Sequence, residues 1–472
     1  MAGYEALDAA AAHARRFLES LSQRRVGPTV SIDDVRGAFD GTMPDGPTDA
    51  VAVIDALAQA ADPGLMGTPS GRFFGFVIGG ALPAALAADW LTSVWDQNAG
   101  LYAAGPAAAV VEEVAGRWLI DLFGLPAHAS FAFVTGAQMA HFTALAAARH
   151  HVLSKAGWDV NADGLFGAPP IRVIVGEQRH VTVDRALKYL GVGASSLHVV
   201  PGDDQGRLDA RGVAGALASG PDGGPTIVCV QAGDVNTGGF DQIGEICDVA
   251  HERGAWVHVD GAFGLWAATS PALRELVDGV ERADSWTTDG HKWLNVPYDS
   301  GFAFCAHPES HNAAVGVHAA YLIQGQGGVR DQVDWTPEFS RRARGFTVYA
   351  ALRSLGRTGV ADMIERCCRY ARRFAEVLGA EDGVEILNDV VLNQVLVAFT
   401  NAAGDDVSAA VVEEVQRDGT CWLSGSVWRG RPVMRISVSN WATTSDDVER
   451  SAEAILRSAA SHYAAVFPRP FR

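Results

Sequence analysis

The strongest constraint on the fold of this 472-residue chain is a regular alternation of short apolar runs with longer helical segments. About seven runs have the length and residue types of buried β-strands. Their first residues are Phe131, Ile171, Leu197, Thr226, Trp256, Ser285 and Gly301. Because helical segments separate most of these runs, consecutive strands can point in the same direction. The alternation therefore predicts a mainly parallel α/β sheet.

One of these runs ends in a carboxylate. Residues 256–259 read WVHV, and Asp260 follows directly, before Gly261 and Ala262. Open α/β sheets bind ligands outside the carboxyl ends of their strands. Asp260 is therefore a candidate ligand-binding residue.

A lysine lies between the last two runs, in the segment DSWTTDGHKWLNVPYDSGFAFC at residues 284–305. Burying the ammonium of Lys292 without a partner would be costly, and a covalent bond to a carbonyl cofactor removes that cost. A surface lysine is the ordinary alternative for an isolated His-Lys pair. A pyridoxal phosphate enzyme needs a lysine for the Schiff base and an acid that keeps the pyridine nitrogen protonated. Lys292 and Asp260 are candidates for that pair.

The two motifs together resemble one known family. HVDGAFG around Asp260 and TDGHKW around Lys292 are similar to the group II pyridoxal phosphate-dependent decarboxylases, which include the aromatic amino acid and glutamate decarboxylases. The resemblance extends from about Phe73 to the C-terminal helix. It implies the type I fold of the aspartate aminotransferase superfamily, pyridoxal 5'-phosphate as the cofactor and an amino acid as the substrate.

The resemblance also assigns roles to individual residues. Lys292 would hold the cofactor, Asp260 would keep its ring nitrogen protonated, and these two residues with His180 form the catalytic set. His180 matches a family histidine that stacks on the ring, although a histidine after a strand can also be structural. The cofactor-binding set is Gly136, Ala137, Gln138, His180, Asn236, Asp260, Ala262, Asp289, His291 and Lys292.

The phosphate group is expected at a strand–turn–helix junction, where free backbone N–H groups point at an anion. The turn Thr135-Gly136-Ala137-Gln138 follows a short strand and begins a long Ala-rich helix. The family usually has small, hydroxyl and acidic residues where this chain has Ala137, Gln138 and Met139. The backbone donors survive this change, but a hydroxyl contact would be lost. His291 would also contact the phosphate.

The substrate pocket is expected to involve two separate segments. Phe74, Phe76 and Ile78 correspond to pocket residues of the family, with core packing as the alternative for each. The segment from Glu309 to Arg344 has little periodicity and is predicted to be a functional loop. In the family this loop carries a tyrosine that protonates the substrate carbon. Gln332 lies at that position, and no tyrosine lies between residues 321 and 349.

Three parts of the chain are predicted: an N-terminal helical segment (1–95), a large cofactor-binding domain (96–345) and a small C-terminal α+β domain (346–472). The resemblance implies that the N-terminal segment packs across a partner in a homodimer, and a cap private to one subunit is the alternative. Arg435, in the small domain, could meet a substrate carboxylate or form a structural ion pair.

Composition limits the remaining possibilities. The formal charge of −18 argues against nucleic acid or an anionic membrane as a partner, and no long charge-free apolar run predicts a membrane helix. The six cysteines form no CxxC pair, which is typical of a reduced, cytoplasmic protein. His251 and His258 have a poor spacing for a metal, and no metal site is predicted.

These observations predict a pyridoxal phosphate-dependent decarboxylase that converts an L-amino acid to its amine and CO2, and the Phe-rich pocket candidates favour an aromatic or apolar amino acid. Decarboxylation coupled to oxidative deamination, which gives an aldehyde, is one alternative. Another reaction at the α-carbon, such as aldol cleavage or transamination, is a second. A catalytically silent pyridoxal-binding homologue is a third, against which the Asp260–Lys292 pair argues.

Overall fold

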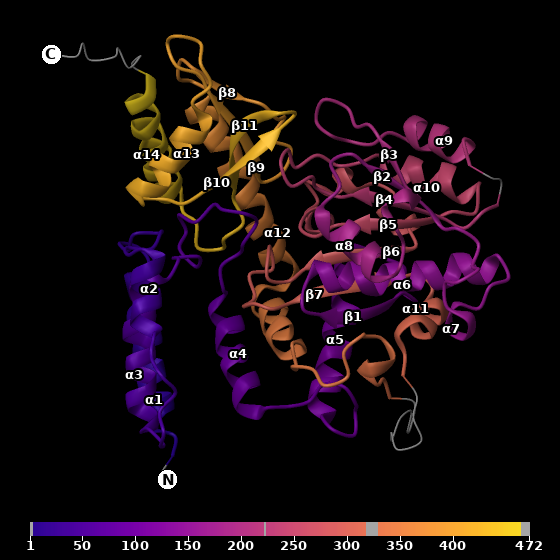
Figure 1. Cartoon of the computed structure of the whole chain (residues 1–472), viewed down its shortest axis with the longest axis horizontal. Helices are drawn as coiled ribbons and strands as arrows, with labels where there is room; N and C mark the ends of the chain where they lie inside the picture. The colour runs from indigo at the N-terminus through magenta and orange to yellow at the C-terminus, as the bar shows by residue number, and fades with distance from the viewer. Residues whose placement is uncertain (1–2, 221–222, 318–328, 464–472) are drawn as a thin grey trace.

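The computed structural model describes residues 3–220, 223–317 and 329–463 (Figure 1). Its centre is a seven-stranded sheet with the order β1-β7-β6-β5-β4-β2-β3. The strands are β1 (Ser130–Val134), β2 (Arg172–Gly176), β3 (Leu197–Val200), β4 (Thr226–Gln231), β5 (Trp256–Asp260), β6 (Ser285–Asp289) and β7 (Gly301–Cys305). β7 runs antiparallel to β1 and β6, and the other pairs are parallel. The predicted mainly parallel sheet is confirmed, and each strand begins within one residue of the predicted position.

Helices precede or follow most of these strands along the chain. They are α5 (Pro106–Phe123), α6 (Ala137–Lys155), α7 (Val160–Asp163), α8 (Val181–Tyr189), α9 (Ala210–Ala218), α10 (Ile243–His251) and α11 (Pro308–Val315). α5 begins with a proline at its first turn and ends at Gly124, which has a left-handed φ of 70°. Both are ordinary helix start and stop signals. α6 lies against β1, β6, β7 and α8, so the turn that begins it is fixed at one edge of the sheet.

The C-terminal part forms a second, smaller sheet with the order β10-β11-β9-β8, in which all neighbours are antiparallel. Its strands are β8 (Val384–Ile386), β9 (Gln394–Phe399), β10 (Ser424–Trp428) and β11 (Arg431–Ser437), and its helices are α12 (Gly345–Leu378), α13 (Ser408–Asp418) and α14 (Ser445–Tyr463). This arrangement confirms the small α+β unit and hence the type I fold. The division into three domains at residues 95 and 345 stays a prediction.

The N-terminal helices stand beside this body rather than inside it (Figure 1). They are α1 (Glu5–Ser20), α2 (Ile32–Phe39) and α3 (Ala50–Ala61), followed by α4 (Pro83–Trp95). No residue of α1, α2 or α3 is buried. Several of their large apolar side chains are exposed, including Leu7, Leu18, Ile32, Phe39, Val53 and Leu57.

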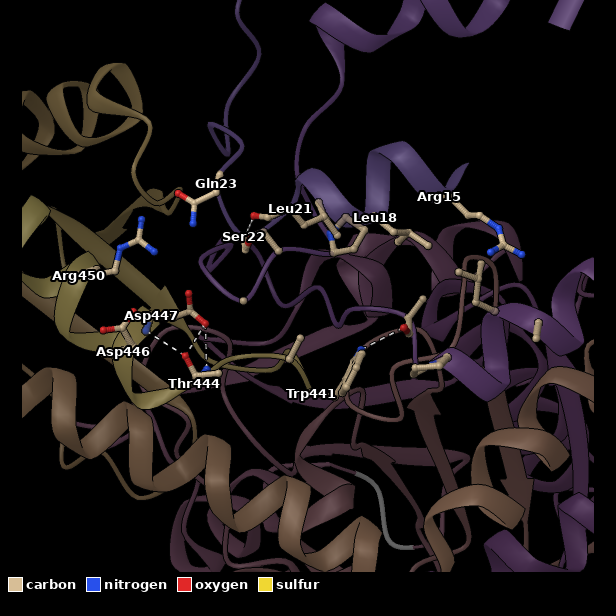
Figure 2. Close-up of a pocket in the computed structure, with 18 of the residues that line it drawn as sticks. Arg15, Leu18, Leu21, Ser22, Gln23, Trp441, Thr444, Asp446, Asp447 and Arg450 are labelled. Atoms are coloured by element: carbon tan, nitrogen blue, oxygen red, sulfur yellow. Dashed lines mark hydrogen bonds between the residues drawn. The ribbon is translucent and has the colours of Figure 1, made fainter. Parts of the chain in front are cut away.

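A pocket of about 800 Å³ lies between these helices and the body. Figure 2 shows Leu18 and Leu21 on one side of it and Trp441 and Thr444 on the other. None of the residues predicted to bind the cofactor is among those that line this pocket. The pocket is therefore a feature of the N-terminal packing and not of the predicted catalytic centre.

Two further expectations concern the chain as a whole. All six cysteines are buried and have free thiols. In the three described ranges, no helix combines the length and the apolar character that crossing a bilayer requires.

Candidate active site

The site lies where two neighbouring strands end. Asp260 is the last residue of β5 and Asp289 the last residue of β6, and both side chains are almost fully buried. In the parallel β5–β6 ladder, Asp260 is paired with Thr287. The chain turns after β6, and this turn brings Lys292 back towards the strand ends. The carboxyl edge of the sheet therefore holds two carboxylates and one lysine.

Lys292 forms its ion pair with Asp289. The Nζ–Oδ2 distance is 3.0 Å, and the lysine side chain keeps 21% of its exposure. The other oxygen of Asp289, Oδ1, accepts a hydrogen bond of 2.6 Å from the backbone N–H of Ala137. Asp289 thus joins the lysine to the first residue of α6. It also uses one of the backbone donors that the sequence predicted for the phosphate.

Asp260 has a different environment. Its Oδ1 accepts the backbone N–H of Ala262 at 3.1 Å, and its Oδ2 lies 3.5 Å from Nε2 of His141. Burial alone would raise the pKa of the Asp260 carboxyl. His141 outweighs this effect, with further contributions from His180 and Lys292, so that the pKa lies well below its usual range. Asp260 is therefore an anion at neutral pH.

Two more predicted histidines lie at this edge of the sheet. His180 begins α8 as its N-cap, and its Nδ1 lies 2.7 Å from the hydroxyl of Thr182. Nδ1 of His291 accepts the backbone N–H of Ser300 at 3.1 Å, and its ring stacks on Tyr298. Burial is the main cause that lowers the pKa of both imidazoles. Both rings are therefore neutral hydrogen-bonding groups near pH 7.

The turn before α6 is too closely packed for larger residues. A Cβ on Gly301 would lie 2.4 Å from the Cα of Gly136, and a Cβ on Gly136 would lie 3.0 Å from Cε1 of His291. Gln138 donates its Nε2 to the carbonyl of Thr182 at 3.3 Å, whereas its Oε1 is buried with no hydrogen-bond partner in the described part of the chain. The turn therefore places the backbone of Gly136 close to His291, and it also contains one buried acceptor, Oε1 of Gln138, that has no hydrogen-bond partner in the described part of the chain. This backbone turn is called the cradle below.

Asn236 and Arg435 come from opposite sides of the junction between the two sheets. The Oδ1 atom of Asn236 accepts the hydroxyl of Ser426, in β10, at 2.7 Å. Nη2 of Arg435 donates to the carbonyl of Phe76 at 3.2 Å, and its Nε is buried without a hydrogen-bond partner among the described residues. Burial lowers the pKa of this guanidinium. Within the described ranges no carboxylate forms an ion pair with Arg435, so the structural ion pair considered from the sequence is not present.

The first predicted pocket segment passes directly beside the lysine. A Cβ on Gly79 would lie 1.9 Å from the carbonyl oxygen of Lys292, which shows how closely the two backbones approach. Phe76 is 53% exposed and Ile78 is partly buried. Phe74 is fully buried, and its ring packs edge-on against Phe374 in α12. The structure therefore brings the backbone of this segment to Lys292 and turns Phe74 into the core, whereas the ring of Phe76 packs on Trp422. The pocket roles of Phe76 and Ile78 stay predictions.

The second predicted pocket residue, Gln332, faces another element. Its side chain is fully buried, and Nε2 donates to the carbonyl of Ala109 in α5 at 3.1 Å. The side chain is therefore bound to α5 and does not contact Lys292 within this chain. Part of the predicted loop is helical, because α11 extends to Val315. Residues 318–328 of that loop lie outside the described residues.

One group near Asp260 was not predicted from the sequence. His141, in α6, and His258, in β5, are both fully buried, and the distance between His141 Nδ1 and His258 Nε2 is 2.9 Å. A signal for His258 was available, because residues two apart in a strand share a face. His141 had no such signal, since it is a single histidine in an Ala-rich helix.

These residues fit pyridoxal phosphate. Lys292 is a partly exposed amine, Asp260 is a buried anion, His180 and Ala262 lie beside them, and the cradle at Gly136 suits an anion. The described residues include no group of three or more His, Cys, Asp or Glu side chains that could hold a metal ion.

Comparison with known proteins gives the same result over most of the chain. Residues 33–401 match the sequence model of the pyridoxal-dependent decarboxylase conserved domain. The aromatic-L-amino-acid decarboxylase of Bacillus atrophaeus is 26% identical over 458 residues, covering 94% of this chain and 92% of the relative. The 4-hydroxyphenylacetaldehyde synthase of Rhodiola rosea is also 26% identical, over 87% of this chain and 85% of the relative.

A solved structure agrees in fold. The crystal structure of Oryza sativa TDC with PLP and tryptamine superimposes with a TM-score of 0.90 at 24% identity, and covers 97% of this chain and 98% of that chain.

Proposed function

Because the chain belongs to the pyridoxal-dependent decarboxylase family and is a pyridoxal phosphate-dependent carboxy-lyase that acts on an amino acid, we propose that its substrate is an L-amino acid with an aromatic or apolar side chain. The exposed ring of Phe76 and the partly buried Ile78 support an apolar side chain, since both belong to the segment whose Gly79 approaches the backbone of Lys292. Relatives named aromatic-L-amino-acid decarboxylase in Bacillus atrophaeus and Sus scrofa support an aromatic one. The product in this proposal is the amine.

Each residue of the site has a role in this proposal. When bound, the cofactor supplies an electron sink for the negative charge that develops at the α-carbon as CO2 leaves. Lys292 would hold it through Nζ, and Asp260 would keep its ring nitrogen protonated. His180 and Ala262 would flank the ring and hold the substrate carboxylate out of its plane, the orientation that favours loss of CO2.

The remaining cofactor-binding residues would fix the phosphate end. The backbone at Gly136 and Gln138 and the neutral ring of His291 would contact the phosphate, and Asn236 would lie near the cofactor. The N–H of Ala137 is held by Asp289, so Ala137 would line this end of the site without donating to the phosphate. Asp289 would keep the Lys292 amine next to α6.

A single observation carries the proposed decarboxylation chemistry: an ionised, buried Asp260 lies at the same sheet edge as Lys292. In the three described ranges, Lys292 is the only lysine at this edge. The experiment is to incubate the holoenzyme with each of the twenty amino acids and to measure CO2 release. An aromatic or apolar amino acid should give the fastest release. Faster release from glutamate or aspartate would refute the proposed substrate class.

A second product is supported by Gln332. A glutamine cannot act as an acid near neutral pH, and this one is buried against α5. Without a tyrosine at this position, protonation of the α-carbon would be less selective, and oxygen could compete to give an aldehyde. The similarity to 4-hydroxyphenylacetaldehyde synthase of Rhodiola rosea agrees with this alternative. Measuring aldehyde, ammonia and peroxide together with the amine separates the two products.

We also propose a homodimer in the cytoplasm. The apolar side chains that α1, α2 and α3 leave exposed, among them Leu18 and Leu57, need a covering surface, and a second copy of the chain supplies one. The free buried thiols fit a reducing compartment. Light scattering on the full chain should give twice the mass of 49.8 kDa. A mass of one chain would refute the dimer.

A further inference from the structure

A chain of hydrogen bonds inside the sheet leads to His141, whose second ring nitrogen faces Asp260. It begins at Trp256 in β5, whose Nε1 donates to the hydroxyl of Ser285 in β6 at 2.9 Å. The same hydroxyl lies 2.8 Å from Nδ1 of His258, and Nε2 of His258 lies 2.9 Å from Nδ1 of His141. Nε2 of His141 then faces Oδ2 of Asp260 at 3.5 Å. All five side chains are at least nine-tenths buried.

The chemistry of the first member fixes the direction of every bond in this chain. An indole N–H can only donate, so Ser285 accepts from Trp256 and has one proton of its own to give. Within the described ranges, the ring of His258 is the remaining partner of that hydroxyl. Ser285 therefore donates to Nδ1 of His258, which must carry its own proton on Nε2. That proton is donated to Nδ1 of His141.

The last step places a proton at Asp260. Nδ1 of His141 acts as an acceptor, so the ring carries a hydrogen on Nε2, which faces the carboxylate. Nε2 is buried and has no hydrogen-bond partner within the described ranges, and Oδ2 of Asp260, at 3.5 Å, is the carboxylate oxygen that it faces. The hydroxyl of Thr287 lies 3.4 Å from Nδ1 of His141 and donates to the carbonyl of Val259 at 3.5 Å. Burial lowers the pKa of His258 to about 3, so this ring is neutral, as the chain of donors requires.

We propose that His141 is a positioning residue that, held in one tautomer by His258 and Ser285, donates its Nε2–H to Asp260 and keeps this carboxylate ionised for the ring nitrogen of the cofactor. The inference rests on the role proposed for Asp260. Asp260 and the ring nitrogen of the cofactor compete for one proton. Because the donor at Asp260 disfavours the protonated carboxyl, this proton stays on the ring nitrogen. The hydroxyl of Ser285 is separated from Asp260 by His258 and His141, and through these two rings it affects the affinity for the cofactor.

The test measures cofactor binding and uses no turnover. The apoprotein of the full chain is titrated with pyridoxal phosphate and with an analogue in which carbon replaces the ring nitrogen. Only pyridoxal phosphate can pair a protonated ring nitrogen with Asp260. The ratio of the two dissociation constants therefore reports this contact. Any loss of affinity at the lysine or at the phosphate affects both compounds equally and cancels in the ratio.

Ser285→Ala is the main variant, because it removes the donor that fixes the tautomers and leaves both histidines in place. Ser130→Ala is its matched control. Ser130 is also a buried serine of the large sheet, and its hydroxyl lies 2.8 Å from Nδ1 of another buried histidine, His311. His141→Phe, which keeps a ring but has no N–H, tests the last step directly.

Ser285→Ala and His141→Phe should each reduce the preference for pyridoxal phosphate over the analogue by about tenfold or more, the equivalent of one pKa unit. Ser130→Ala should leave it unchanged. An unchanged preference in Ser285→Ala, or an equal reduction in Ser130→Ala, would overturn the relay. Asp260→Asn separates the two ideas. If Asp260→Asn abolishes the preference and Ser285→Ala leaves it unchanged, only the relay is wrong. If Asp260→Asn leaves the preference unchanged, the proposed role of Asp260 is wrong.

Discussion

Replacement of Glu112 by glutamine should destabilise the protein far more than the same change at the next residue. Glu112 and Arg341 form an ion pair of 2.7 Å in which both side chains are at most 1% exposed. Arg341 also donates to the carbonyls of Ala99 and Phe133, so it ties the segment before α12 to β1. Glu112 also raises the pKa of a second buried guanidinium, Arg330, against the lowering effect of burial.

The magnitude follows from this burial. Removing one partner of a buried pair leaves an uncompensated charge, which costs about 3–5 kcal/mol. Glu113 pairs with Arg117 at the same distance of 2.7 Å, but these side chains are 33% and 62% exposed. Such an exposed pair on a helix contributes about 0.3–0.5 kcal/mol. At about 2 °C per kcal/mol, Glu112→Gln should lower the thermal midpoint by about 6–10 °C and Glu113→Gln by about 1 °C.

The assay is thermal unfolding of the apoproteins, followed by circular dichroism at one protein concentration. Glu113→Gln is the control, because it makes the same chemical change one residue away in α5. A double variant, Glu112→Gln with Arg341→Gln, should recover part of the loss, since it removes the uncompensated charge. Equal shifts in the two single variants would refute the reasoning from burial.

Three further predictions concern the site. Borohydride treatment of the holoenzyme should leave the pyridoxyl adduct on Lys292, and an adduct on Lys155 or Lys188, the other lysines of the chain, would contradict the assignment. Asp260→Ala should retain some cofactor but lose about 3–4 kcal/mol of transition-state stabilisation, and a loss of turnover below about tenfold would rule out its electrostatic role. Gln332→Tyr should raise the ratio of amine to aldehyde, and this idea fails if the wild-type enzyme already forms amine alone.

The sheet was predictable from the sequence because its signals are local. Each strand is a short apolar run, and the intervening helices carry their own start and stop residues, such as Pro106 and Gly124. The antiparallel direction of β7 also has a local reason. No α-helix connects β6 to β7, and a parallel neighbour would require such a crossover.

Side-chain directions were less predictable, because they depend on packing between distant segments. Counting from flanking residues placed Gln332 in the loop, but its contact with Ala109 of α5 joins positions more than 200 residues apart. Phe74 and Phe76 lie two residues apart, but Phe74 packs on Phe374 in the core, whereas Phe76 has a left-handed φ of 59° and an exposed ring beside Trp422. The sequence pattern gave both rings the same role.

The arrangement of charges at the strand ends gives a reason for the histidine in α6. Two buried carboxylates share this edge of the sheet with a single lysine, and Lys292 pairs with Asp289. Asp260 would then be a buried anion without compensation whenever no ring nitrogen faces it, which is costly in a low-dielectric interior. His141 supplies a donor that is already in place. The same two carboxylates therefore have different roles because one meets a cation and the other an oriented imidazole.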